Sequence, residues 1–168
     1  KKILLLDRDG TLNKRSLPGE YINSLREFIW IESSRDALKI LAKNGFSFIV
    51  ITNQAGVSLG KTAVSDLEAI HDQLRADFQS DGLTLLDIYV CTDHWNSESE
   101  FRKPEPGMFF AAANRHKFRL DQVIYVGDET RDVESAKKAN IKVIAVSWGF
   151  NSSEALGKQN PDFLIHDP

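Results

Sequence analysis

The chain has 168 residues, a length typical of one domain with a sizeable core. Its composition is 42% hydrophobic and 27% charged, as in ordinary globular proteins, and no apolar run approaches the roughly 18 residues needed to cross a bilayer. The net charge of −3 gives no electrostatic reason to expect a nucleic-acid partner, and the single cysteine excludes an internal disulfide.

These bulk properties also set expectations about location and organisation. No signal peptide is visible and no disulfide indicates an oxidising compartment, so the cytoplasm is the expected location. The chain starts without Met and enters an apolar run at once. We therefore expect a monomer with one domain over residues 1–168, or the same domain as a module of a larger fused chain.

Short apolar runs and helical patterns alternate along the chain. Such alternation predicts an α/β fold, a Rossmann-like three-layer sandwich with a mostly parallel sheet covered on both faces. Phe109 and Phe110, in the third predicted helix, are both expected in the core. In chain order the predicted elements are strand Ile3–Leu6, helix Ser33–Asn44, strand Phe46–Ile51, helix Ala63–Phe78, strand Leu86–Cys91, helix Gly107–His116, strand Val123–Val126, helix Arg131–Ala139, strand Val143–Val146 and strand Phe163–Ile165.

Two long connections separate the first motif-bearing segments. One runs from Thr11 to the second strand, and the other from Gln54 to Arg102. Once their own helices and strand are placed, neither has room for a further folded domain, which needs upwards of about 50 residues. The sequence therefore predicts no cap domain, with the loops Asn13–Ser24 and Thr92–Phe101 covering the site.

The first strand is followed by two closely spaced carboxylates. Ligands of open parallel sheets bind beyond the carboxyl ends of the strands, and Asp7 and Asp9 stand there with Arg8 between them. Two such carboxylates can share a hard cation such as Mg²⁺, or act as nucleophile and as general acid and base. Gly10 allows close approach of the backbone to a ligand. The alternative interpretation is a solvated acidic turn.

Two further segments carry groups that can hold a phosphate. The hydroxyl of Thr52 and the amide of Asn53 follow the second strand and can bond phosphate oxygens, although an ordinary turn would look the same. Lys103 precedes Pro104, and a second proline, Pro106, stiffens the same segment. A fixed ammonium there can neutralise a phosphoryl group, whereas the alternative is a surface basic pair.

The fourth strand ends at another pair of acidic residues. Asp128 follows Gly127 directly and can complete a cation site with Asp7. Asp132 lies four residues further on, one helical turn along the same face. Capping of the following helix by acidic residues is an alternative that does not exclude metal binding.

The four motifs, in this order at the ends of successive predicted strands, closely resemble those of the haloacid dehalogenase superfamily of phosphohydrolases over nearly the whole chain. The segments Asp-Arg-Asp-Gly-Thr-Leu-Asn, Thr-Asn-Gln-Ala-Gly-Val and Arg-Lys-Pro-Glu-Pro-Gly-Met are similar to those of the D-glycero-D-manno-heptose 1,7-bisphosphate phosphatases. The related histidinol-phosphate phosphatases share much of this pattern.

The resemblance implies a Mg²⁺-dependent phosphatase that forms an aspartyl phosphate on Asp7. Asp9 would protonate the leaving oxygen and then activate water. Its backbone carbonyl would bind the metal together with Asp7 and Asp128, and Asp132 would support that site. The other site residues assigned are Thr52 and Lys103 for the phosphoryl group and Arg8, Gly10, Asn53, Arg102 and Glu129 for the substrate.

Two departures from the family pattern bear on metal and substrate. Members of this subgroup often carry a zinc loop after the third strand. Here Cys91 is present, His94 is displaced by one position and the closing cysteine pair is absent, so no zinc is expected. Glu129 stands where the heptose enzymes often have a basic residue, and an acid there would repel a second substrate phosphate.

The expected partner is a small phosphorylated substrate, with no membrane and no nucleic acid. A heptose bisphosphate is the first substrate, histidinol phosphate the second, and a 3′-phosphorylated nucleic-acid end the third. Two other classes of function stay open. One is a non-catalytic module that binds a phosphorylated ligand, and the other is a kinase using the segment 56–62. That segment has three residues between its glycines where a P-loop needs four.

Overall fold

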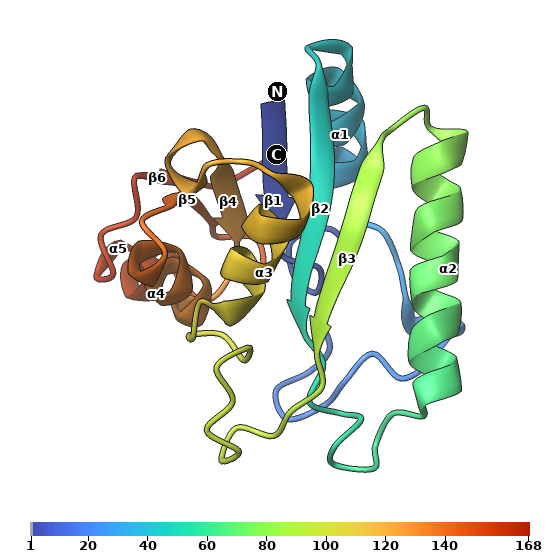
Figure 1. The fold of residues 1–168 in the computed structure, drawn as a ribbon. Helices are drawn as coiled ribbons and strands as arrows, with labels where there is room; N and C mark the ends of the chain where they lie inside the picture. The colour runs from blue at the N-terminus through green and yellow to red at the C-terminus, as the bar shows by residue number, and fades with distance from the viewer. Residues whose placement is uncertain (1) are drawn as a thin grey trace.

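Six parallel strands form a single sheet in the order β3-β2-β1-β4-β5-β6 (Figure 1). The computed structural model describes residues 2–168. The chain adds strands outward on one side of β1, then crosses back and adds them on the other. The strand order therefore reverses between β1 and β4, which is where open sheets of this kind bind ligands. The strands are β1 (Lys2–Leu6), β2 (Phe46–Asn53), β3 (Leu85–Cys91), β4 (Ile124–Gly127), β5 (Lys142–Val146) and β6 (Phe163–Ile165).

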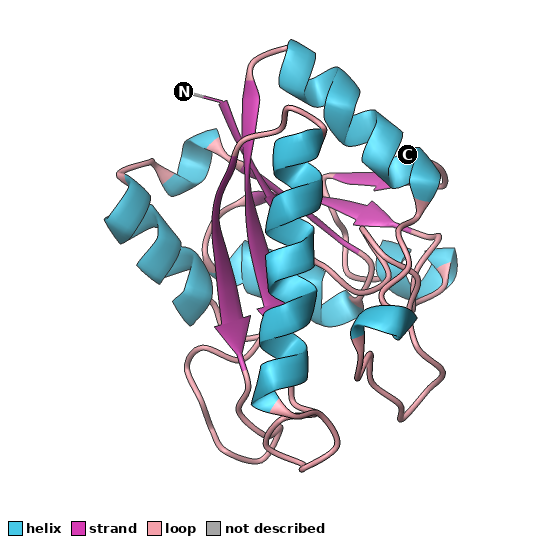
Figure 2. Ribbon diagram, turned by 90° about the vertical axis from the view of Figure 1, so that its right-hand side faces the viewer, coloured by secondary structure: helices cyan, strands magenta, loops and turns pink. Residues whose placement is uncertain are grey.

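Helices cover both faces of this sheet (Figure 2). Successive side chains of a strand point to opposite faces, so Leu4 and Leu6 belong to one apolar cluster and Ile3 and Leu5 to the other. This is why the continuous apolar run of β1 is buried on both sides. The first cluster includes residues of α1 (Glu32–Lys43) and α2 (Val64–Ser80), and the second includes residues of α3 (Gly107–His116), α4 (Thr130–Lys138) and α5 (Ser153–Gly157).

The predicted α/β architecture is confirmed, and the predicted strands and helices agree with the structure to within two residues at each end. The short helix α5 was not predicted, because five residues are too few to show a helical period. Within the described chain, the long connections contain no folded unit beyond the predicted elements and a single 3-10 turn at Leu25–Glu27. The site is therefore covered by loops rather than by a cap domain.

One expectation about the core is wrong. Phe109 is fully buried and its ring stacks edge-on against Tyr125 at a centroid distance of 4.8 Å. Phe110, the next residue of α3, is 47% exposed. Adjacent residues of a helix point about 100° apart, so only one of two neighbouring aromatic rings can face the sheet fully.

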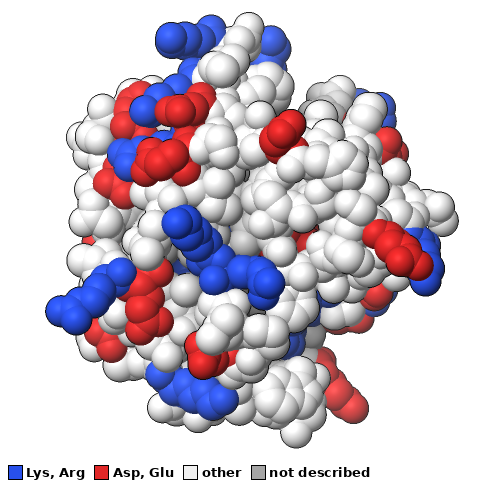
Figure 3. Space-filling model, turned by 180° about the vertical axis from the view of Figure 1, so that it is seen from behind, with Lys and Arg blue, Asp and Glu red and all other residues white. Residues whose placement is uncertain are grey.

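The surface shows no segregation of charge on the face drawn in Figure 3. Lys and Arg side chains lie next to Asp and Glu side chains over much of that face, between wide uncharged areas. That face therefore gives a polyanion no continuous track to bind. Among residues 2–168, no helix combines the length and apolar character that crossing a membrane requires.

The two neighbouring phenylalanines provide a test of this packing. We expect Phe109→Ala to lower the free energy of unfolding by about 3–5 kcal/mol, because it leaves a cavity against Tyr125. Phe110→Ala, the matched control one residue away, should cost at most about 1 kcal/mol. Urea unfolding followed by circular dichroism measures both, and equal losses would contradict the assignment of faces on α3.

Candidate active site

Three carboxylates meet where the strand order reverses. Asp7 follows β1, Asp128 follows β4, and Asp132 lies in the first turn of α4. The pairing of β1 with β4 continues beyond the strand, because the Asp7 amide donates to the Val126 carbonyl at 2.9 Å. All three carboxylates are buried, and each offers an oxygen within 4.8 Å of the others.

Glycine at position 10 allows the loop after β1 to pass against Asp128. Gly10 has a φ of +84°, and a Cβ atom there would overlap the Asp128 carboxylate. The predicted close approach of this backbone is therefore to a carboxylate of the site itself. Asp128 is held from two other directions. It accepts a hydrogen bond from the Thr11 hydroxyl at 3.3 Å and one from the Phe150 amide at 2.7 Å.

Lys103 inserts a buried ammonium between these carboxylates. Its Nζ lies 3.0 Å from Oδ1 of Asp7 and 2.7 Å from Oδ1 of Asp132. Nζ also donates to the Tyr125 hydroxyl at 2.8 Å and the Ile51 carbonyl at 3.2 Å. The Tyr125 hydroxyl in turn donates to Asp132 at 2.7 Å. The ammonium is thus fixed by groups from β2, β4 and α4 at once.

Asn53 fixes the backbone of the same lysine. Its amide nitrogen donates to the Lys103 carbonyl at 3.0 Å, and its amide oxygen accepts from the Lys103 amide at 3.1 Å. The end of β2 is thereby joined to a segment fifty residues later in the chain. Asn53 also lines the pocket, so a residue of the pocket wall holds the backbone of Lys103 in place.

The electrostatics of this cluster favour a bound cation. Burial, and then the neighbouring Asp132 carboxylate, raise the pKa of Asp7 well above its ordinary value, although Lys103 opposes the shift. Burial raises the pKa of Asp128 to about 7. Burial alone would lower the pKa of Lys103, but Asp132 and Asp7 outweigh it and raise that pKa. One ammonium does not offset three buried carboxylates, and a hard cation with oxygen ligands would.

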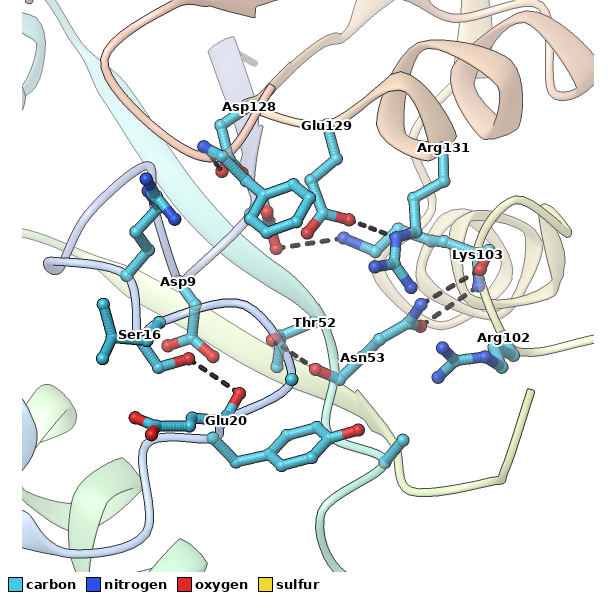
Figure 4. Close-up of a pocket in the computed structure, with 17 residues that line it drawn as sticks. Asp9, Ser16, Glu20, Thr52, Asn53, Arg102, Lys103, Asp128, Glu129 and Arg131 are labelled. Carbon is cyan, nitrogen blue, oxygen red and sulfur yellow. Dashed lines mark hydrogen bonds and ion pairs between the residues drawn. The ribbon is translucent and has the colours of Figure 1, made fainter. Parts of the chain in front are cut away.

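A pocket opens in front of these carboxylates (Figure 4). Asp128, Glu129 and Arg131 stand on one side of it, and Ser16 and Glu20 of the loop after β1 stand on the other. The predicted site residues that line it are Asp7, Asp9, Thr52, Asn53, Arg102, Lys103, Asp128 and Glu129.

Two residues assigned to the substrate lie elsewhere. Gly10 is buried against Asp128 and does not line the pocket. Arg8 is fully buried behind the pocket, where its guanidinium forms a two-pronged ion pair with the Asp9 carboxylate. The strand-like alternation of side chains after β1 explains this, because Asp7 and Asp9 face one way and Arg8 the other.

Other pocket residues were not assigned to the site from the sequence. Most come from the loop 13–24 after β1, which was expected to cover the site, and the rest come from the segment after β2, the loop after β5 and the first turn of α4. The position of Arg131, directly before Asp132 in the Gly-Asp motif, was a signal that could have been used. These residues are Arg15, Ser16, Leu17, Gly19, Glu20, Tyr21, Ala55, Arg131 and Phe150.

Glu129 does not stand in the pocket as an isolated acid. It forms an ion pair with Arg131. Burial, and then the charge of Asp132, raise its pKa above the ordinary value. Both effects weaken the repulsion of a second substrate phosphate that the sequence led us to expect. The paired arginine places a cation at the same point of the wall.

The segment that resembles a shortened zinc loop is held by other contacts. The Cys91 thiol is buried and lies 3.5 Å from a carboxylate oxygen of Asp93. The His94 ring stacks on Trp95 at a centroid distance of 3.7 Å. Asp93 also accepts a hydrogen bond from Arg102 at its carbonyl, at 3.3 Å, which connects this loop to the pocket wall.

The raised pKa of Asp128 predicts how stability depends on pH without metal. A carboxyl with a raised folded-state pKa contributes stability at low pH, and this contribution is lost as the pH rises through the folded-state value, about 7 here. Asparagine cannot ionise. In EDTA, the Tm of Asp128→Asn minus that of the wild type should therefore increase between pH 5 and pH 8.5. Thermal melts across that range test it, and a constant difference would contradict it.

Comparison with known proteins gives consistent results. A model of the HAD-hydrolase-like family matches residues 100–167. The D-glycero-beta-D-manno-heptose-1,7-bisphosphate 7-phosphatase of Pseudomonas putida is 36% identical over 98% of this chain and 92% of its own length. The D-glycero-alpha-D-manno-heptose-1,7-bisphosphate 7-phosphatase of Mycobacterium tuberculosis is 36% identical over 92% of this chain and 78% of its own.

Among solved structures, D,D-heptose 1,7-bisphosphate phosphatase from B. bronchiseptica, complexed with magnesium and phosphate, superposes with a TM-score of 0.90. It is 28% identical, and the match covers 99% of this chain and 93% of that one. The D,D-heptose 1,7-bisphosphate phosphatase from Burkholderia thailandensis, at 20% identity and a TM-score of 0.72, shares the fold.

Proposed function

Because the chain belongs to the haloacid dehalogenase-like phosphatases, in the family of the heptose 1,7-bisphosphate 7-phosphatases, we propose that it removes the 7-phosphate of D-glycero-D-manno-heptose 1,7-bisphosphate. It acts as a single catalytic domain on this small substrate. The observation that carries the proposal is the buried cluster of Asp7, Asp128 and Asp132 around the Lys103 ammonium, at the floor of the pocket.

Mg²⁺ is the cofactor that this cluster fits. The donors are buried carboxylate oxygens with an excess of negative charge, which suits a hard divalent cation. Asp7, Asp128 and the backbone carbonyl of Asp9 are the proposed ligands. Asp132 already accepts from Lys103, Tyr125 and the Glu129 amide, so it supports the site. When bound, the ion would offset the repulsion among the carboxylates and the phosphoryl oxygens.

The reaction is a double displacement at phosphorus. A carboxylate oxygen of Asp7 forms a bond to phosphorus as the bond to the sugar oxygen breaks, and Asp9 in its protonated form gives its proton to that departing oxygen. Asp9 then takes a proton from water as the water oxygen bonds to phosphorus and the phosphate leaves Asp7. Lys103 and Thr52 hold the phosphoryl oxygens during both steps, because both line the pocket beside Asp7.

Burial alone would raise the pKa of Asp9 in the free site. The Arg8 charge and the hydrogen bonds from Asn13 and Gln54 outweigh burial and lower that pKa. Asp9 therefore takes up its proton when the negatively charged substrate binds beside it, because a nearby anion raises the pKa of a carboxyl group.

The wall of the pocket suits a substrate with two phosphates. Arg15, Arg102 and Arg131 line it together with the catalytic carboxylates. The Arg15 guanidinium lies over the Phe150 ring at 5.5 Å, and Arg131 pairs with Glu129. Guanidinium groups bind phosphate oxygens in pairs of hydrogen bonds. Cations outside the reacting centre therefore favour a bisphosphate over a monophosphate.

The substrate is tested by phosphate release in the presence of Mg²⁺. We expect both anomers of the heptose 1,7-bisphosphate to have a kcat/KM at least about tenfold above those of histidinol phosphate and a 3′-phosphorylated oligonucleotide, since a lost charged contact costs on the order of 1.5–3 kcal/mol. Chelation with EDTA should abolish release. Faster turnover of another ester would leave the proposed reaction standing and would refute the heptose bisphosphate as the substrate.

The role of Asp7 is tested by substitution with a residue of the same shape. Asp7→Asn should lower kcat by on the order of 10⁴-fold or more, because the amide cannot form the phosphoryl ester. The fold should persist, and in EDTA the Tm should not fall, because one of the mutually repelling carboxylates is gone. Asp121→Asn, on the surface beside Arg119, is the control and should retain full activity. Turnover by a clean Asp7→Asn preparation would refute this role.

A further inference from the structure

Arg8 is the largest of the fully buried side chains, and its charge lies just behind the pocket. Its Nε donates to Oδ1 of Asp9 at 2.8 Å, and its Nη2 donates to Oδ2 at 3.0 Å. The planar guanidinium therefore grips both oxygens of the carboxylate, which fixes direction as well as distance. The front of Asp9 stays open, since 31% of its side chain is exposed.

The remaining prong of the guanidinium is held by α2. Nη1 of Arg8 lies 3.0 Å from Nε2 of His71, which is buried. Arginine has no acceptor, so Nε2 must be the unprotonated nitrogen and His71 must be neutral. Burial, and then the Arg8 charge, lower the pKa of His71 to about 3, in agreement with this assignment. The Phe28 ring, 5.8 Å from the guanidinium carbon, closes a third side.

The other contacts of Asp9 come from neutral amides. Asn13 Nδ2 donates to Oδ1 at 2.9 Å, and Gln54 Nε2 donates to Oδ2 at 3.0 Å. Both amides are buried as well, but each gives Asp9 one hydrogen bond from a neutral group, whereas the guanidinium gives two and carries a full charge. Arg8 is thus the charged, two-pronged member of the set that orients Asp9.

We propose that Arg8, held in place by His71, is the positioning residue that aims the Asp9 carboxylate at the departing oxygen. The inference rests on the proposed function, in which Asp9 exchanges the proton. Arg8 stays protonated throughout, so it moves no proton itself. The pair links catalysis to α2, an element that contributes no residue to the pocket lining.

The test compares two esters that depend differently on a proton donor. 4-Nitrophenyl phosphate releases a stable phenolate, which needs little protonation as it departs. The heptose bisphosphate releases an alkoxide, which must be protonated as it departs. The ratio kcat/KM reports steps up to departure of the alcohol and is unaffected by the later hydrolysis of the phosphoenzyme. A misaimed Asp9 therefore slows the alkyl ester selectively, while general damage to the fold slows both esters alike.

Arg8→Lys keeps the charge and removes the two-pronged grip. We expect its kcat/KM to fall at least about tenfold more for the heptose bisphosphate than for 4-nitrophenyl phosphate, since general acid catalysis is worth about 10²–10⁴-fold. His71→Leu should show the same selectivity to a smaller degree, and His71→Gln, which restores an acceptor, should recover part of it. If Arg8→Lys does not fold, the two His71 variants carry the test. Ile70→Val, buried on the same helix and without a polar atom, is the matched control.

The outcomes are distinct. Selective loss in Arg8→Lys or His71→Leu, with both esters unaffected in Ile70→Val, supports the proposal. Equal loss for the two esters in folded variants overturns it and leaves the phosphatase assignment standing. If the wild type does not hydrolyse the heptose bisphosphate, the proposed substrate fails, and benzyl phosphate then serves as the alkyl ester for the same comparison. Release from none of these esters would overturn both.

Discussion

The whole site depends on one buried ammonium between two carboxylates. Three acidic side chains packed within 4.8 Å repel one another, and Lys103 offsets part of that repulsion through Asp7 and Asp132. Neither charge could be buried alone, because an unpaired ion in the interior is far more costly than a paired one. The carbonyl of Ile51 and the hydroxyl of Tyr125 complete the ammonium's shell, so strands on both sides of β1 share in holding it.

The order of the strands explains why this cluster forms where it does. The order in which strands are added reverses between β1 and β4, and because these two strands are parallel, the chain leaves both at the same edge of the sheet. Asp7 and Asp128 therefore meet although they are far apart in sequence. Gly10 permits the close contact between the two loops, because a side chain there would overlap Asp128. Two of the pocket arginines lie in loops around this floor, and the third, Arg131, lies in the first turn of α4. Loops tolerate sequence change, so recognition can vary while the carboxylate cluster stays in place.

The first motif combines the proposed reacting groups with their support. Asp7 and Asp9 line the pocket, while Arg8 between them faces α2 and ties Asp9 to His71. A charged residue that looks like a substrate ligand in the sequence is instead part of the scaffold. The end of β2 also combines lining and support in one segment, because Asn53 lines the pocket and its side chain is hydrogen-bonded to the backbone of Lys103.

The sequence by itself determined the α/β class, the order of strands and helices along the chain, and the polar residues that lie at or just beyond the carboxyl ends of β1, β2 and β4. It could do so because apolar periodicity is local and because parallel strands carry their functional groups at one edge. It placed the end of β2 at Ile51, whereas the strand continues to Asn53. Only the tertiary structure decided which way Arg8 points, which of Phe109 and Phe110 is buried, and that Arg15 and Phe150 reach the pocket. Loops have no period, and the contacts of a buried charge come from elements far away in the chain, so no local pattern contains them.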